Sequence, residues 1–143
     1  MIHIDDGWNT TLQQDWFAAL TGTGKVSVHD WDIFGFSFYS FYGSGATLPA
    51  LAQTLTTLAH QYGKPMHVAE TDWPVTCTAA QDGQLTLSDT QVPISVQGQI
   101  EWVRDIGQVL EQTPFGLGRG LHYWEPAWLN STVCCLANEA KTR

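Results

Sequence analysis

One glutamate in this sequence stands where a catalytic carboxylate would be expected. Glu70 follows the short apolar segment His67-Val68-Ala69, which is typical of a buried strand, and Trp73 lies close behind it. A carboxylate beside an aromatic ring at the end of a strand suits hydrolysis of a glycosidic bond, because the carboxylate supplies charge and the ring a stacking surface. An ordinary acidic loop after an edge strand is the alternative for this stretch taken alone.

Three further candidates stand near the ends of two earlier strands. His3 and Asp5 are two residues apart, so their side chains share one face of a strand, and we expect them to contact sugar hydroxyls. A buried, hydrogen-bonded His–Asp pair is the alternative. Tyr39 ends the second strand and is predicted to donate a hydrogen bond that keeps the Glu70 carboxylate ionised. A tyrosine that only packs at the edge of the core is the alternative.

The remaining candidates surround the last strand. Trp124 and Trp128 are predicted to stack on sugar rings, and Trp73 ranks below them, although burial in the core is the alternative for each tryptophan. Glu125 is the other carboxylate near a strand end and, in an isolated α/β protein, would be a candidate for the acid.

Strands and helices alternate in a way that brings these candidates together. Strands are predicted at residues 2–5, 32–39, 67–70 and 120–125, and helices at about 10–20, 47–62 and 95–112. This order predicts an α/β fold with a parallel sheet, whose strands all end at the same edge. Four such units make half of an eight-stranded barrel, and an open four-stranded sheet is the competing architecture.

Two of the helices carry apolar stripes that are predicted to face the core. In the second helix the stripe is Leu48, Leu51, Leu55, Leu58 and Tyr62, and in the third it is Ile100, Val103, Ile106 and Leu110.

The composition restricts the classes of partner. With six Lys plus Arg against fourteen Asp plus Glu, the net charge of −8 argues against a surface for nucleic acid or anionic membrane. Hydrophobic residues make up 43% of the chain, which is typical of a globular protein, and no apolar run is long enough to cross a membrane. We therefore expect neither nucleic-acid nor membrane partners.

Four stretches taken together resemble glycoside hydrolase family 53, the arabinogalactan endo-β-1,4-galactanases, and they resemble fungal members most. The stretches occur in the family's order and at about its spacing, and they cover nearly the whole chain: Ile2–Trp8, Asp32–Tyr39, Gly63–Val75 and Tyr123–Trp128. The resemblance implies that residues 1–143 are one partial catalytic domain. That domain would be the C-terminal half of a TIM (β/α)8 barrel, with strands five to eight.

The resemblance also implies the roles of the residues. It makes Glu70 the nucleophile of a retaining mechanism and places the acid/base glutamate at the end of strand four, upstream of Met1. Since the family places its acid elsewhere, Glu125 is expected to contact substrate or to be structural. The implied substrate is the β-1,4-galactan of pectin side chains, and the implied enzyme is secreted, extracellular, and without a cofactor or metal.

A half-barrel has expected consequences of its own. Without the acid/base it should be nearly inactive on galactan, and it should expose two strand edges and half of an apolar interior. The missing N-terminal half of the barrel is therefore the implied partner. A non-catalytic remnant that still binds galactan is the alternative function.

The three cysteines do not have the spacing of a zinc site, and Cys77 could pair with one of the adjacent Cys134 and Cys135. The resemblance to fungal members implies the same bridge, because they pair the cysteines of the last two loops. Which of Cys134 and Cys135 bonds to Cys77 stays open.

Overall fold

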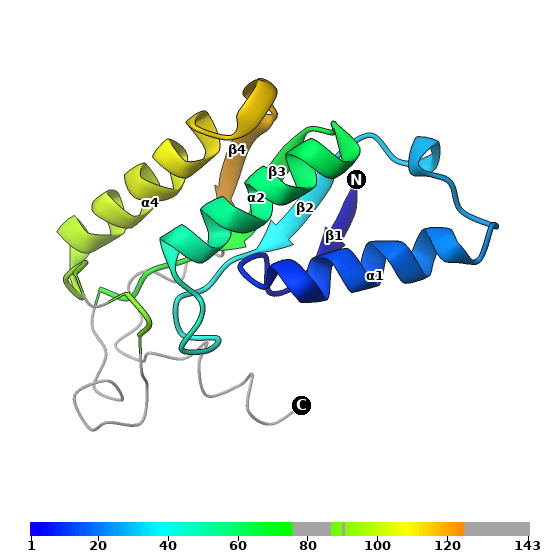
Figure 1. Ribbon diagram of the computed structural model, residues 1–143. Helices are drawn as coiled ribbons and strands as arrows, with labels where there is room; N and C mark the ends of the chain where they lie inside the picture. Colours follow the sequence, from blue (N-terminus) through cyan, green and yellow to red (C-terminus); the bar gives the residue numbers. More distant parts are fainter. Residues whose placement is uncertain (76–86, 90, 125–143) are drawn as a thin grey trace.

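The computed structural model describes residues 1–75, 87–89 and 91–124 (Figure 1). Its sheet has four parallel strands in the order β1-β2-β3-β4, so strands that follow each other along the chain are neighbours. The strands are β1 (Ile2–Ile4), β2 (Phe34–Ser37), β3 (Met66–Thr71) and β4 (Gly118–Tyr123). The predicted α/β fold with a parallel sheet is confirmed, and β4 begins two residues before the predicted start.

The connections between strands contain three long helices, which lie over one face of the sheet (Figure 1). They are α1 (Thr10–Gly22), α2 (Leu48–Tyr62) and α4 (Val96–Glu111), with short 3-10 turns at Val28–Asp30 and Pro114–Gly116. Each long helix begins after a capping side chain, from Asn9, Thr47 and Ser95 respectively, that accepts a hydrogen bond from a backbone N–H of the first turn. None of the helices in these described ranges is long and apolar enough to span a membrane.

The core lies between the sheet and the helices. Alternate strand residues point into it, and Phe34, Phe36, Met66 and Val68 are fully buried there. The predicted stripe of α2 is confirmed, because Leu51, Leu55 and Leu58 are fully buried and Leu48 and Tyr62 pack against the same cluster.

The predicted stripe of α4 is confirmed at Ile106 and Leu110 and wrong at Ile100, while Val103 is half-buried and does not belong to the core cluster. Ile100 is 57% exposed, whereas Trp102, Ile106 and Leu110 are buried. The helix is rotated so that Trp102 fills the space above β3, where its ring stacks on Phe38. Ile100 is thereby left on the exposed surface of α4.

The opposite face of the sheet differs from the apolar half-interior expected of a half-barrel. Its side chains include His3, His67, Ala69 and His122, and none of these four is buried. Glycines lie between them: a Cβ on Gly35 would approach Ala69 to 3.3 Å, and one on Gly120 would approach the ring of His67 to 3.3 Å. Met1 also lies over Gly35, because its Sδ would be 2.9 Å from that Cβ. Across the described residues this face therefore carries mainly histidines, with Met1 and Ala69 as its small apolar part.

Candidate active site

Glu70 owes its position to an irregularity in the sheet. Phe36 pairs with Val68, but the next residue of β2, Ser37, pairs with Glu70, so one residue of β3 is left over between them. Such a bulge changes the direction in which the following side chain points. Here it places the Glu70 carboxylate beside Ser37, at the carboxyl end of the sheet.

Two hydroxyl groups of the β2 segment donate to the same oxygen of Glu70. Ser37 Oγ lies 3.1 Å from Glu70 Oε2, and Tyr39 Oη lies 3.2 Å from it. His3 Nδ1 lies 3.9 Å from the other oxygen, Oε1. The contact expected between Tyr39 and Glu70 is present, and the two donors together hold the carboxylate in one orientation.

Tyr39 is a neutral hydrogen-bond donor in this setting. Burial raises the pKa of its phenol far above the usual range, and the Glu70 and Asp72 carboxylates raise it further. Burial also raises the pKa of Tyr42, with Asp5 as the next cause. The ring of Tyr42 lies 4.8 Å from that of Tyr39. The carboxyl end of the sheet thus combines carboxylates with phenols that keep their protons.

His3 and Asp5 do not form the buried pair that was the alternative. Asp5 is exposed, and its carboxylate accepts a hydrogen bond from the backbone N–H of Asp6. His3, whose side chain is 32% exposed, instead places Nε2 2.9 Å from Ser37 Oγ. Both residues are exposed, and His3 also contacts Ser37, which holds Glu70.

The two described tryptophans among the candidates differ in exposure. Trp124 is 38% exposed directly after β4, and its backbone N–H donates to the carbonyl of Thr71. Trp73 is only 1% exposed because its ring packs on Trp102 at 4.7 Å and its Nε1 donates to the carbonyl of Pro93. In this structure Trp73 belongs to the core, which corrects the expectation that it stacks on a sugar, while Trp124 has a face available.

The segment that follows Glu70 is fixed by a polar cluster. Tyr123 Oη donates to the carbonyl of Trp73 and accepts from its backbone N–H, and Gln99 Nε2 donates to both Tyr123 Oη and the Trp73 carbonyl. Sequence reasoning missed Gln99, Tyr123 and Ser37 as parts of the site. Only Ser37 left a signal, because a hydroxyl two residues before Tyr39 shares its strand face.

A second histidine contact lies on the same face of the sheet, between β3 and β4. His67 Nε2 and His122 Nδ1 are 2.8 Å apart, and burial followed by the neighbouring His122 lowers the pKa of His67. Five of the predicted site residues, Glu125, Trp128, Cys77, Cys134 and Cys135, lie outside the described residues.

The chain matches one protein family over nearly its whole length. The family model of Glycosyl hydrolase family 53 matches residues 1–142. The chain is 42% identical over 135 residues to the probable arabinogalactan endo-beta-1,4-galactanase A of Neosartorya fischeri, and 35% identical over 131 residues to the arabinogalactan endo-beta-1,4-galactanase of Humicola insolens. These alignments cover 93% and 92% of this chain, but only 37% and 39% of the relatives.

Solved structures agree with the sequence comparison. A structure described as one of two fungal beta-1,4-galactanases superimposes with a TM-score of 0.80 at 34% identity, covering 92% of this chain and 40% of the other. A catalytic domain from Ignisphaera aggregans superimposes with a TM-score of 0.71 at 22% identity, covering 89% of this chain and 35% of that domain. The chain therefore spans well under half the length of the proteins that it matches.

Proposed function

Because the chain belongs to glycosyl hydrolase family 53, we propose that it is the C-terminal half of the catalytic barrel of a retaining endo-β-1,4-galactanase. In this proposal the four strands are strands five to eight. The observation that carries the proposal is the Glu70 carboxylate, held at the carboxyl end of a parallel sheet by two hydroxyl donors. In barrels of this class the catalytic groups come from this end of the strands.

In the first step of the proposed reaction a Glu70 oxygen attacks the anomeric carbon of a galactose residue. A carbon–oxygen ester bond forms, the glycosidic bond breaks, and the departing oxygen takes a proton from a second carboxylic acid. Water then gives a proton to the second group, which is now a carboxylate, and attacks the same carbon. The ester bond breaks, and the carboxylate of Glu70 is released. Ser37 and Tyr39 keep the carboxylate oriented throughout, since neither hydroxyl is consumed.

The second carboxyl group would have to lie about 5–5.5 Å from Glu70 in a retaining enzyme. We assign it to the other half of the barrel, as the family resemblance implies. Glu125, which lies outside the described residues, keeps the proposed role of a substrate contact or a structural group.

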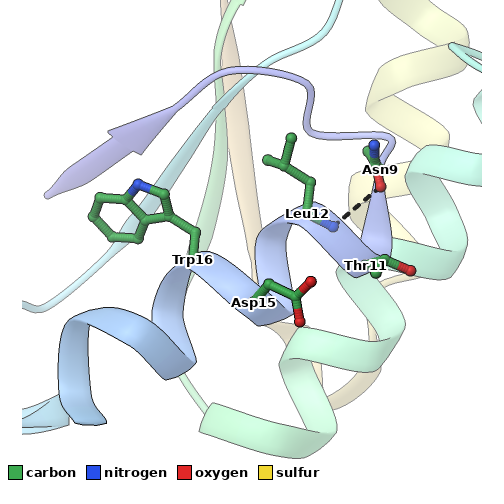
Figure 2. A pocket seen from close by; sticks show the side chains of 5 residues that line it. All are labelled: Asn9, Thr11, Leu12, Asp15 and Trp16. Carbon is green, nitrogen blue, oxygen red and sulfur yellow. Dashed lines mark hydrogen bonds between the residues drawn. The ribbon is translucent and has the colours of Figure 1, made fainter.

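The flank of α1, which is its exposed side away from α2, supports the proposal that another part of the polypeptide completes the barrel. Thr10 and Gln14 turn toward α2, where they hydrogen-bond to Thr54 and Gln61. Leu12 and Trp16, one turn apart on another side of α1, are 38% and 40% exposed. They line a shallow depression together with Asn9, Thr11 and Asp15 (Figure 2). A helix of a neighbouring strand–helix unit would cover this apolar side.

The flank of α4 is similar. Val96 and Ile100 are exposed one turn apart, and Gln99 beside them reaches β4, which is an edge of the described sheet. The other edge, β1, leads into α1, whose Gln13 donates a hydrogen bond to the carbonyl of Asp5 directly after β1. Each flank thus combines an unpaired strand edge with an exposed apolar side of a helix, which is the surface that the next unit of a closed barrel would bury.

We also propose that β-1,4-galactan is the substrate and that the enzyme acts outside the cell. Trp124, exposed beside the site, would stack on a galactose ring, and His3 and Asp5 would contact its hydroxyls. The proposed disulfide between Cys77 and Cys134 or Cys135 fits an extracellular setting, where disulfides persist. A galactan-binding remnant without turnover is the second candidate, favoured only by the exposed Trp124.

Covalent trapping tests the proposal. Residues 1–143 are fused behind the part of the Humicola insolens galactanase that precedes the matched region, and this protein is called the fused barrel. A 2-fluoro-galactobioside with an activated leaving group should add one glycosyl group to Glu70, detected by peptide mass spectrometry. Glu70→Gln should abolish both the adduct and galactan hydrolysis, whereas Glu101→Gln on α4 should change neither. An adduct on another residue would refute the assignment of Glu70.

A further inference from the structure

His3 contacts Glu70 mainly through another side chain. Its Nε2 lies 2.9 Å from Ser37 Oγ, and Ser37 Oγ lies 3.1 Å from Glu70 Oε2, while the direct approach of His3 Nδ1 to Oε1 is 3.9 Å. A separation of 3.9 Å is too long for a hydrogen bond. The short contacts therefore run in series from His3 to Ser37 to Glu70.

The direction of these hydrogen bonds follows from the chemistry of the groups. An ionised carboxylate only accepts, so the single hydroxyl proton of Ser37 is donated to Glu70. Ser37 Oγ can then act only as an acceptor toward His3. The imidazole must carry its proton on Nε2, and the series reads His3 Nε2–H to Ser37 Oγ–H to Glu70 Oε2.

We propose that His3 and Ser37 are positioning residues for the nucleophile, and that they leave Oε1 as the attacking oxygen. This inference rests on the proposed function of Glu70. Ser37 is 5% exposed, so its hydroxyl finds few competing water molecules. His3 keeps that hydroxyl directed at Glu70, and among the described residues no hydroxyl donates to Oε1.

A direct sugar contact is the other role open to His3, and the two roles predict different kinetics. A positioning residue acts on the step in which the glycosyl-enzyme forms, so its loss lowers kcat and leaves KM nearly unchanged. A sugar contact acts on substrate binding, and its loss raises KM regardless of what stands at position 37. Removing Ser37 should therefore remove the effect of His3 only if the two residues act in series.

A double-mutant cycle in the fused barrel separates these roles. Ser37→Ala should lower kcat on galactan about 10- to 100-fold, as expected for a hydrogen bond to a charged group. His3→Ala should lower it about 10-fold, whereas in the Ser37→Ala background it should have an effect of at most about twofold. His3→Gln, which can donate from a similar place, should restore most of the activity, and His29→Ala on the surface should have no effect.

Independent multiplication of the two effects, or a rise in KM alone, would overturn the inference. A nuclear magnetic resonance measurement of the imidazole nitrogens of His3 tests it without turnover. The neutral ring should be protonated at Nε2 in the unsubstituted protein, and a proton at Nδ1 would overturn the inference even if Glu70 is trapped. If Glu70 is not trapped while Nε2 carries the proton, the proposed function fails and the positioning role fails with it, and only the hydrogen bond from His3 to Ser37 stands.

Discussion

Gly98, in the first turn of α4, is predicted to be intolerant of any side chain. A Cβ there would lie 1.7 Å from the carbonyl oxygen of Pro93 and 3.0 Å from Trp73 Nε1. The same carbonyl accepts the Trp73 Nε1 hydrogen bond at 2.9 Å, so it cannot move without loosening the segment that follows Glu70. Overpacking costs about 1–3 kcal/mol, and loss of one hydrogen bond costs about 1 kcal/mol.

The helix itself would favour the opposite result. Replacing a glycine inside a helix by alanine normally stabilises a protein by about 0.5–1 kcal/mol. Subtracting this gain, we expect Gly98→Ala to lower the free energy of unfolding by about 1–3 kcal/mol. A Cβ added to Gly107 in the same helix would meet no atom within 4 Å, so Gly107→Ala is the matched control and should be stabilising.

Urea unfolding of the fused barrel, followed by tryptophan fluorescence, measures both variants. Trp73 and Trp102 lie at the site of the change, so the signal reports on it directly. Equal stability of the two variants, or a gain for Gly98→Ala, would mean that the Pro93 carbonyl can move freely. The packing of Trp73 would then not fix the segment after Glu70.

Three other changes test the site and the sheet. Tyr39→Phe keeps the ring contacts with Phe41 and Tyr42 but removes a donor to Glu70, so kcat on galactan should fall about 10- to 100-fold with little change in KM. Trp124→Ala should weaken galactan binding, measured as a rise in KM or in the retardation constant of affinity electrophoresis; unchanged binding would exclude stacking there. The pKa of His67 in the folded protein lies below 6.5, the usual pKa of histidine. At a pH between the folded and the unfolded pKa, the unfolded chain binds more protons than the folded one, so the free energy of unfolding falls as the pH falls. His67→Gln should make the urea midpoint less sensitive to acidification below about pH 6.5, and an unchanged pH dependence would contradict this.

The order of elements and the place of Glu70 could be predicted because both depend on local sequence. Apolar runs of strand length alternate with helical stripes, and Glu70 directly follows such a run. The exact partners of Glu70 could not be predicted, because they depend on the shift that pairs Ser37 with Glu70 across two strands. A one-residue change of register moves every later side chain to the other face.

Two wrong predictions, for Ile100 and for Trp73, depend on tertiary contacts that the local sequence does not contain. Ile100 and Trp102 both lie on apolar stripes of α4, and the sequence alone does not tell which of the two stripes meets the sheet. Trp73 could equally have faced a ligand. Its burial is decided by the Pro93 carbonyl, which comes twenty residues later and receives its indole N–H.

The distribution of apolar surface indicates how the proposed barrel is held closed. The face of the sheet opposite the helices presents His3, His67 and His122, and its apolar side chains are only Met1 and Ala69 beside Gly35, so it offers less apolar area to an opposing half than the helix flanks do. The large exposed apolar side chains of the helices lie instead on the flanks, at Trp16 and Ile100. Hydrophobic stabilisation is roughly proportional to the apolar area removed from water. Closure therefore gains most from helix packing at the two flanks and from pairing of β1 and β4, while the interior remains polar enough to hold the groups that orient Glu70.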